Sequence, residues 1–240
     1  MLKPSSTLSP ALARWLSPMA IAAAASFVAL PASAGTYTEV GDAGQTQGTA
    51  QSTTAVAAPL TDIFGTLTSG TDADLFLIYI ANPALFSAST NNNNSGLVDT
   101  HLFLMTLAGA PIYINDDADG TTVLSTLPAG SGLGPVAAGF YLLGVATSGY
   151  DPVNINAQLL FAPNIVTTDV RGPASGLSPA VLGGFTGSPF DGGSERYDIK
   201  LTGVGLVVPE PATMLLAAMA TGLCAFTSSR RRRVAAPAAA

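Results

Sequence analysis

The chain has very little cysteine and histidine: among its 240 residues it carries only Cys224 and His101. One cysteine excludes an intramolecular disulfide, and the pair leaves too few nitrogen and sulfur ligands for a typical zinc site. A Ser-His-Asp triad would have to use His101, and no Gly-x-Ser-x-Gly turn lies near it. These absences predict a hydrogen-bonded or surface histidine and no catalytic residues.

Positive charge is also scarce. Between residues 35 and 208 the basic residues are Arg171, Arg196 and Lys200, against fourteen acidic residues, which gives this segment a net charge of −11. Such a balance argues against nucleic acid or an anionic membrane as a partner. It is compatible with divalent cations, with basic partners, or simply with solubility outside the cell.

A helical period of helix length is missing between residues 35 and 205. From residue 60 onward, short runs rich in Ile, Phe, Leu, Tyr and Val are separated by Gly, Asn, Asp and Pro, which is the punctuation of strands and turns. The predicted strands are residues 62–67, 74–80, 85–90, 101–107, 112–114, 140–146, 155–161 and 196–204. We therefore expect an all-β fold, an antiparallel β-sandwich with a jelly-roll-like arrangement, over residues 60–208.

Two of these strands carry informative patterns. Residues 74–80 are apolar on both faces, as in a strand packed on both sides, whereas residues 197–202 alternate strictly and should have one wet face. Residues 35–59 are small and polar and predict a loose N-terminal segment with one edge strand near Tyr37. Residues 163–191, rich in Gly, Pro and Ser, predict a long loop or an insertion before the last strand.

The first 34 residues have the features of a secretory signal peptide, which would form an N-terminal signal helix. Lys3 and Arg14 supply positive charge, and residues 19–30 form a short apolar run. Ala32 and Ala34 fit the small-x-small cleavage pattern, so Gly35 is the predicted mature start.

The C-terminus combines three features in order: Pro209-Glu210-Pro211, an uncharged apolar run at residues 212–227, and Arg230, Arg231, Arg232 and Arg233. A helix of that length spans roughly 24 Å, which is marginal for a hydrocarbon core of about 30 Å. Residues 228–229 extend it, so we predict a transmembrane helix at 212–229. The arginines favour the cytoplasmic side, and everything before Pro209 would lie outside. Residues 234–240 form a short tail.

This tail, residues 209–233, resembles the bacterial PEP-CTERM sorting signal. The resemblance implies recognition by an exosortase, a membrane protease thought to cleave near the Pro-Glu-Pro triplet. It also implies a precursor held transiently in the inner membrane with a cytoplasmic C-terminus. The mature protein would then reach the cell surface or the extracellular matrix.

The middle of the chain carries a second resemblance, over roughly residues 62–146. Its parts are residues 70–76, 86–90, Asp99 with 102–104, 115–117 and 138–142, in that order. This succession is similar to the bacterial pre-peptidase C-terminal domain, a small β-sandwich of secreted proteins. The resemblance implies a non-catalytic accessory module that in some members binds calcium or assists substrate binding. Thr106 departs from the family, which often has Asp there.

Oxygen ligands recur in Asn115-x-Asp117-x-Asp119-Gly120, which is like the opening of a calcium loop. Thr126 stands where an EF-hand would close with Glu, so this is not an EF-hand. The predicted calcium ligands come from Asp72, Asp74, Asp99, Asn115, Asp116, Asp117 and Asp119. The alternative is an Asx-rich turn with solvated carboxylates.

Two functions fit these observations. The first is an exported, non-catalytic binding or structural module of the cell surface or matrix, with extracellular polysaccharide as a candidate partner. The second is a secreted hydrolase that acts on polysaccharide through paired carboxylates. The fourteen acids of the central segment allow many pairs, and none stands out.

Overall fold

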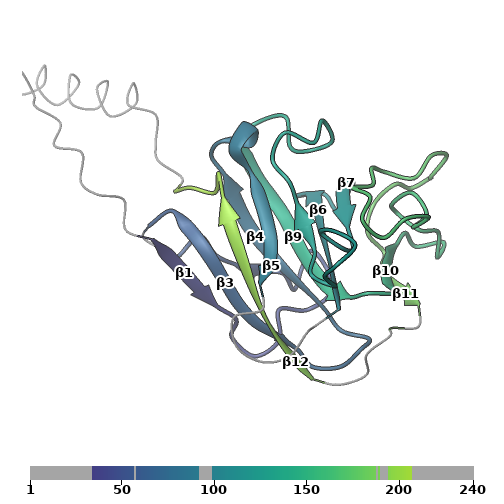
Figure 1. Cartoon of the computed structure of the whole chain (residues 1–240), viewed down its shortest axis with the longest axis horizontal. Helices are drawn as coiled ribbons and strands as arrows, with labels where there is room; N and C mark the ends of the chain where they lie inside the picture. Colours follow the sequence, from purple (N-terminus) through teal and green to yellow (C-terminus); the bar gives the residue numbers. More distant parts are fainter. Residues whose placement is uncertain (1–33, 57, 92–98, 188, 190–193, 207–240) are drawn as a thin grey trace, which may run out of the picture. The chain divides into compact units, whose positions relative to one another are not determined.

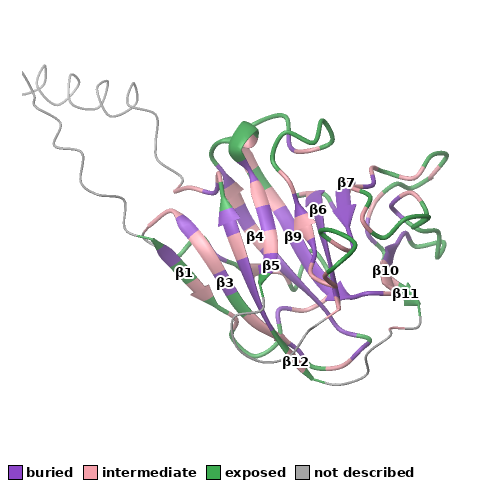
Figure 2. Ribbon diagram, in the orientation of Figure 1, coloured by how far each residue is buried: buried purple, intermediate pink, exposed green. Residues whose placement is uncertain are grey.

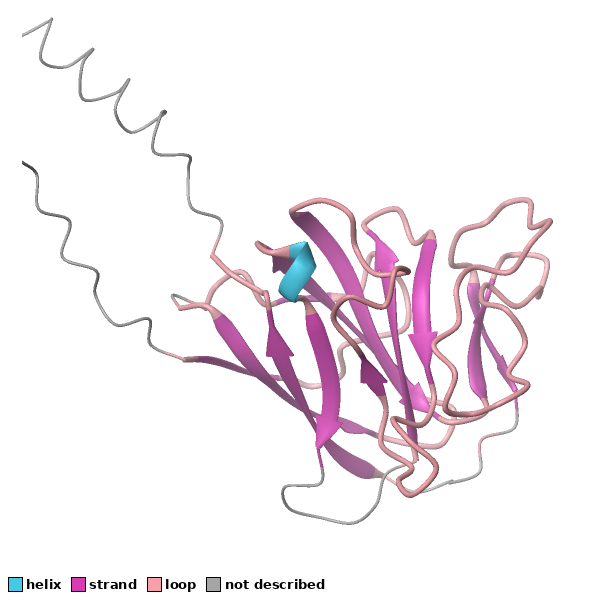
Figure 3. Cartoon of the chain, turned by 45° about the horizontal axis from the view of Figure 1, so that its top comes forward, coloured by secondary structure: helices cyan, strands magenta, loops and turns pink. Residues whose placement is uncertain are grey.

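The computed structural model describes residues 34–56, 58–91, 99–187, 189 and 194–206. These residues form an all-β fold, as the sequence predicts, with one short 3-10 turn at Pro83–Leu85 (Figure 3). The strands are β1 (Gly35–Thr38), β2 (Gln51–Ser52), β3 (Leu60–Leu67), β4 (Ala73–Ile80), β5 (Ser87–Asn91), β6 (Thr100–Thr106), β7 (Pro111–Asn115), β8 (Thr126–Leu127), β9 (Gly139–Thr147), β10 (Tyr150–Val153), β11 (Gly184–Gly187) and β12 (Glu195–Thr202).

The strands are arranged in two five-stranded sheets and one small one (Figure 1). The first sheet has the order β1-β3-β12-β5-β8, and the second has the order β2-β4-β9-β6-β7. Strands β10 and β11 pair separately. Consecutive strands often fall in different sheets, so the chain passes repeatedly from one sheet to the other.

The pairing is antiparallel except at two edges. β1 pairs with β3 in parallel, and β2 pairs with β4 in parallel. Within residues 60–208 the described strands pair antiparallel, as expected. The correction concerns residues 35–59, expected to be loose with one edge strand near Tyr37, because they contribute two strands, β1 and β2. The cause lies in the N-terminal segment, which adds one strand to each sheet through a crossover instead of a hairpin. Its small polar residues carry no apolar alternation that would predict this.

Apolar side chains of both sheets pack into a shared core. In β4, Phe76, Ile78 and Ile80 enter this core, while Ala73 and Leu75 belong to a second cluster on the opposite face. Burial on both faces explains why residues 74–80 form a continuous apolar run. In β12 Tyr197, Ile199 and Leu201 are buried, as the alternation predicts, but the opposite face is only partly wet: Thr202 is exposed, Lys200 is half-buried and Asp198 is buried.

The outer face of the second sheet is covered by the segment that follows β9, residues 148–187, which we call the covering segment. Leu160, Phe161 and Leu182 from this segment pack on Phe103 and other apolar residues of the sheet. Figure 2 accordingly shows extensive burial along β6, β7 and β9. The second sheet thus has a protein layer on each side.

The predicted strand at residues 155–161 is wrong, since the strand here is β10, which ends at Val153. Asn154 then closes a turn: its Oδ1 accepts the backbone N–H groups of Asn156 and Gln158 at 2.9 and 3.0 Å. Ala157 adopts a positive φ of 57° inside that turn. The apolar spacing that suggested a strand reflects Leu160 and Phe161, which enter the second cluster from a loop.

The two predicted terminal helices lie outside the described residues, as do Ala32, the Pro209-Glu210-Pro211 triplet and the arginines at 230–233. Ala34 is described and exposed, and Gly35 is buried at the start of β1. Within the described part of the chain, no helix has the length and apolar character needed to cross a bilayer.

Candidate functional site

Three of the predicted calcium ligands come together at one end of the second sheet. Asp99 immediately precedes β6, and Asp116 and Asp117 immediately follow β7. Because β6 and β7 are antiparallel neighbours, with Leu102 opposite Asn115, the start of one strand lies beside the end of the other. One carboxylate oxygen from each of the three aspartates lies within 4.8 Å of the other two.

A pocket of about 400 Å³ opens at this group of aspartates. Its walls come from four segments: the start of β6, the residues after β7, the turn from β9 into β10, and the loop at 164–167. They include, beside the three aspartates, His101, Val123, Ser148, Gly149, Asp151, Asn164, Ile165 and Thr167. The walls are therefore rich in oxygen side chains.

Asp116 is the most enclosed of the three carboxylates, with 5% of its surface exposed. Its Oδ2 accepts a hydrogen bond from Asn164 Nδ2 at 2.6 Å. Its Oδ1 is buried and accepts no hydrogen bond of good geometry among the described residues, although the side chain of Ser148 lies close enough to lower the pKa of the carboxyl group. Burial raises the pKa of this carboxyl group. A buried carboxylate oxygen that lacks a donor suits a bound cation.

His101 borders the same pocket but is held by protein groups. Its Nε2 lies 2.8 Å from the carbonyl oxygen of Tyr150, so Nε2–H donates. Its Nδ1 then faces Asp151 at 3.7 Å. Burial lowers the pKa of His101, which is 1% exposed, and favours the neutral ring. The histidine is thus hydrogen-bonded, one of the two roles that the sequence suggested.

Three other predicted ligands do not join this group and act in local structure instead. Asp72 Oδ2 accepts the backbone N–H and the hydroxyl of Thr68. Asn115 Oδ1 accepts the N–H of Thr126 at 2.8 Å. Asp119 is exposed, and its Oδ1 accepts both donors of Thr121. These are the turn-forming roles of the Asx-rich alternative.

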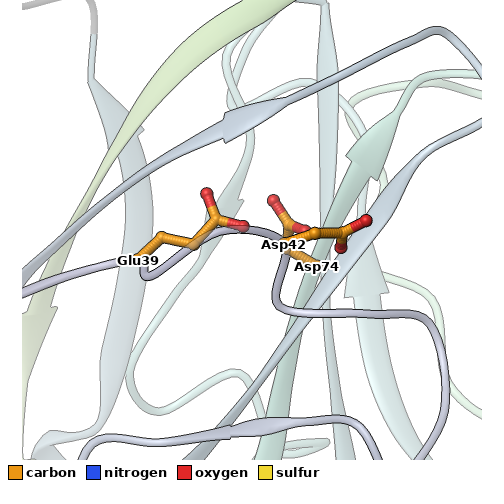
Figure 4. A group of neighbouring side chains, drawn as sticks. All are labelled: Glu39, Asp42 and Asp74. Atoms are coloured by element: carbon orange, nitrogen blue, oxygen red, sulfur yellow. The ribbon is translucent and has the colours of Figure 1, made fainter.

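Asp74 belongs to a second acidic group, with Glu39 and Asp42 (Figure 4). Glu39 and Asp42 lie in the segment after β1, which sequence reasoning treated as loose. No periodic pattern connects that segment to β4, so the sequence contains no signal for this contact. Asp74 is fully buried, and its Oδ2 accepts a hydrogen bond from the Tyr197 hydroxyl at 2.7 Å.

No protein-family model matches the chain, and a search of curated proteins finds none significantly similar to it. The resemblances to a PEP-CTERM signal and to a pre-peptidase C-terminal domain therefore remain predictions. The candidate site is defined by its own chemistry: clustered carboxylates are hard oxygen donors, the ligand type that calcium prefers.

Proposed function

We propose that the chain is an exported protein of the cell surface or extracellular matrix, with a non-catalytic β-sandwich that binds a ligand with the help of calcium. The observation that carries this proposal is the convergence of Asp99, Asp116 and Asp117 at the pocket. Calcium takes six to eight oxygen ligands. The three aspartates supply part of that set, and water or ligand hydroxyl groups supply the rest.

The strand order supports a binding role. The eight strands β3, β4, β5, β6, β7, β8, β9 and β12 can be counted from first to eighth along the chain. In this count the order β3-β12-β5-β8 of one sheet reads 1-8-3-6. The order β4-β9-β6-β7 of the other sheet reads 2-7-4-5. We infer a jelly roll, an architecture that recurs in lectin domains. Polysaccharide is the partner class that we assign, because its hydroxyl groups can complete a calcium coordination sphere.

Export and sorting rest on the sequence at the two ends. The signal peptide at 1–34 directs export. The Pro209-Glu210-Pro211 triplet, the apolar run and the arginines hold the precursor briefly in the inner membrane, where an exosortase-type protease acts on it. The acidic central segment supports solubility outside the cell.

The test is retention of the purified chain on extracellular polysaccharide in calcium and in EDTA. We expect retention in calcium, loss in EDTA, and loss in the Asp117→Asn variant. Asp119→Asn is the matched control, because Asp119 is exposed, takes part only in a local turn and should bind as wild type. Retention that is independent of calcium and of Asp117 would contradict the proposal. Release of reducing sugar ends would favour the hydrolase instead.

A further inference from the structure

The Asp74 carboxyl group presents an unusual hydrogen-bonding situation. Its side chain is fully buried at the start of β4, and Oδ2 accepts the hydroxyl proton of Tyr197. Oδ1 is also buried, and no donor reaches it among the described residues. A buried acceptor without a donor destabilises the folded state. Whether Asp74 Oδ1 carries a proton therefore affects the stability of the folded protein.

The carboxylate of Glu39 lies beside Asp74 in the same acidic group. Its Oε1 accepts the backbone N–H of Ala43 and its Oε2 accepts that of Thr66, each at 2.8 Å. Burial raises the pKa of Glu39, and these two backbone donors together with a hydrogen bond to Asp74 oppose that rise. Figure 4 shows this carboxylate directed toward the two aspartates, and the three groups lie within 4.8 Å.

Everything titratable that faces Asp74 is acidic. Glu39 and Asp42 come from the segment after β1, Asp72 comes from the turn before β4, and Tyr197 comes from β12. None of the ion pairs among the described residues includes Asp74, Glu39 or Asp42. Among the described residues, therefore, no basic side chain neutralises the charge of these three acids.

We propose that Asp74 carries a proton and donates it from Oδ1 to the carboxylate of Glu39, so that this acid pair fastens the N-terminal segment, residues 34–56, to β4. The proton supplies the donor that Oδ1 otherwise lacks and removes one negative charge. Gly65 leaves room for Glu39 and Tyr197 to lie close to Asp74. A Cβ at position 65 would lie 2.7 Å from Glu39 Oε2 and would also collide with the Tyr197 hydroxyl.

The pair makes the attachment of the N-terminal segment sensitive to pH. Burial raises the pKa of Asp74 from 3.8 to about 8, the Tyr197 hydrogen bond opposes the rise, and the charges of Glu39, Asp72 and Asp42 add to it. In the unfolded chain the proton leaves near pH 4, whereas the folded chain keeps it to about pH 8. Stability from this group is therefore lost progressively as pH rises through that window and levels off above it.

The test compares the melting temperatures of full-length wild type and Asp74→Asn in EDTA from pH 5 to 9. Asparagine is neutral, and its amide can accept from Tyr197 and donate to Glu39. The melting temperature of the variant minus that of wild type should rise between pH 5 and 8 by roughly 3 °C or more. Above pH 8 this difference should level off. Asp119→Asn should show a constant difference over the same range, and a constant difference for Asp74→Asn would overturn the proposal.

Infrared spectroscopy provides a second measurement that does not depend on stability. At pH 7 the difference spectrum of wild type minus Asp74→Asn should contain the carbonyl band of a protonated carboxylic acid. Absence of that band would overturn the proposal. So would a melting temperature that depends on calcium through Asp74, because a cation would then occupy the place assigned to the proton.

Discussion

Gly144 of β9 lies directly opposite Phe103 of β6, and the phenylalanine ring covers it. A Cβ at position 144 would collide with this ring. The ring in turn packs against Phe161 and Phe185 at centroid distances of 6.3 and 5.8 Å, so it has little room to withdraw. The absence of a side chain at Gly144 is thus a condition for packing the covering segment.

We predict that Gly144→Ala lowers the free energy of unfolding by about 1–3 kcal/mol, the usual range for overpacking. Urea unfolding measures this. Gly139→Ala is the control in the same strand, because its nearest neighbour to a new Cβ is a Tyr141 ring carbon at 3.9 Å. Equal effects of the two substitutions would show that the ring moves aside.

The sequence names Asp99, Asp116 and Asp117 among seven candidate calcium ligands, and the structure brings these three together because they flank the paired strands β6 and β7. The sequence cannot separate them from Asp72, Asn115 and Asp119, since all have oxygen side chains in turns. Only the structure shows which oxygens accept backbone N–H groups. The sequence does not predict that Glu39 contacts Asp74, because the two are distant in sequence and the segments that carry them belong to different sheets.

Among the elements, the segment between β9 and β12 depends on one buried side chain. Asn154 is 1% exposed and makes four hydrogen bonds: its Oδ1 accepts two backbone N–H groups, and its Nδ2 donates to Gln158 Oε1 and to the Pro179 carbonyl, both at 2.9 Å. It therefore ties the turn after β10 to the residues before β11.

Asn154→Ala should destabilise the protein by about 1–3 kcal/mol, because buried donors and acceptors lose their partners. The loss should be concentrated in the covering segment, and limited proteolysis should cut between residues 154 and 182 faster than in wild type. Asn156→Ala removes a single hydrogen bond from an exposed side chain and serves as the control. Unchanged proteolysis of Asn154→Ala would show that the segment is held by its apolar contacts alone.

The same segment explains why strand prediction fails here and succeeds elsewhere. Strands such as β4 and β12 pair along their length, so their residues form a recognisable run, apolar on both faces in β4 and alternating in β12. Leu160 and Phe161 are buried without a continuous ladder, because the segment lies on the face of a sheet. Burial of this kind has no period, and apolar residues alone then suggest a strand that is absent.

At the scale of the whole molecule, the two ends determine what the mature protein contains. We predict that the form extracted from the cell surface begins at Gly35 and lacks the arginines at 230–233. Gly35 already starts β1, and its N–H donates to the Pro59 carbonyl at 2.9 Å, so the fold begins where the signal peptide is expected to end. Intact-mass measurement checks both ends, and a chain that extends to Ala240 would contradict the C-terminal part.

The whole architecture also brings together what the calcium proposal needs, since the aspartates come from two strand ends and the pocket from four segments. A ligand that binds only the folded state stabilises it by about 2.7 kcal/mol at a hundredfold excess over its Kd. For a domain of this size that corresponds to a rise in melting temperature of roughly 5–10 °C.

The most direct test of the calcium site is therefore the melting temperature of the purified chain in calcium against EDTA. We predict a rise of roughly 5 °C or more in calcium for wild type and Asp119→Asn, and little or no rise for Asp117→Asn. Identical melting temperatures of wild type in calcium and in EDTA would contradict the account.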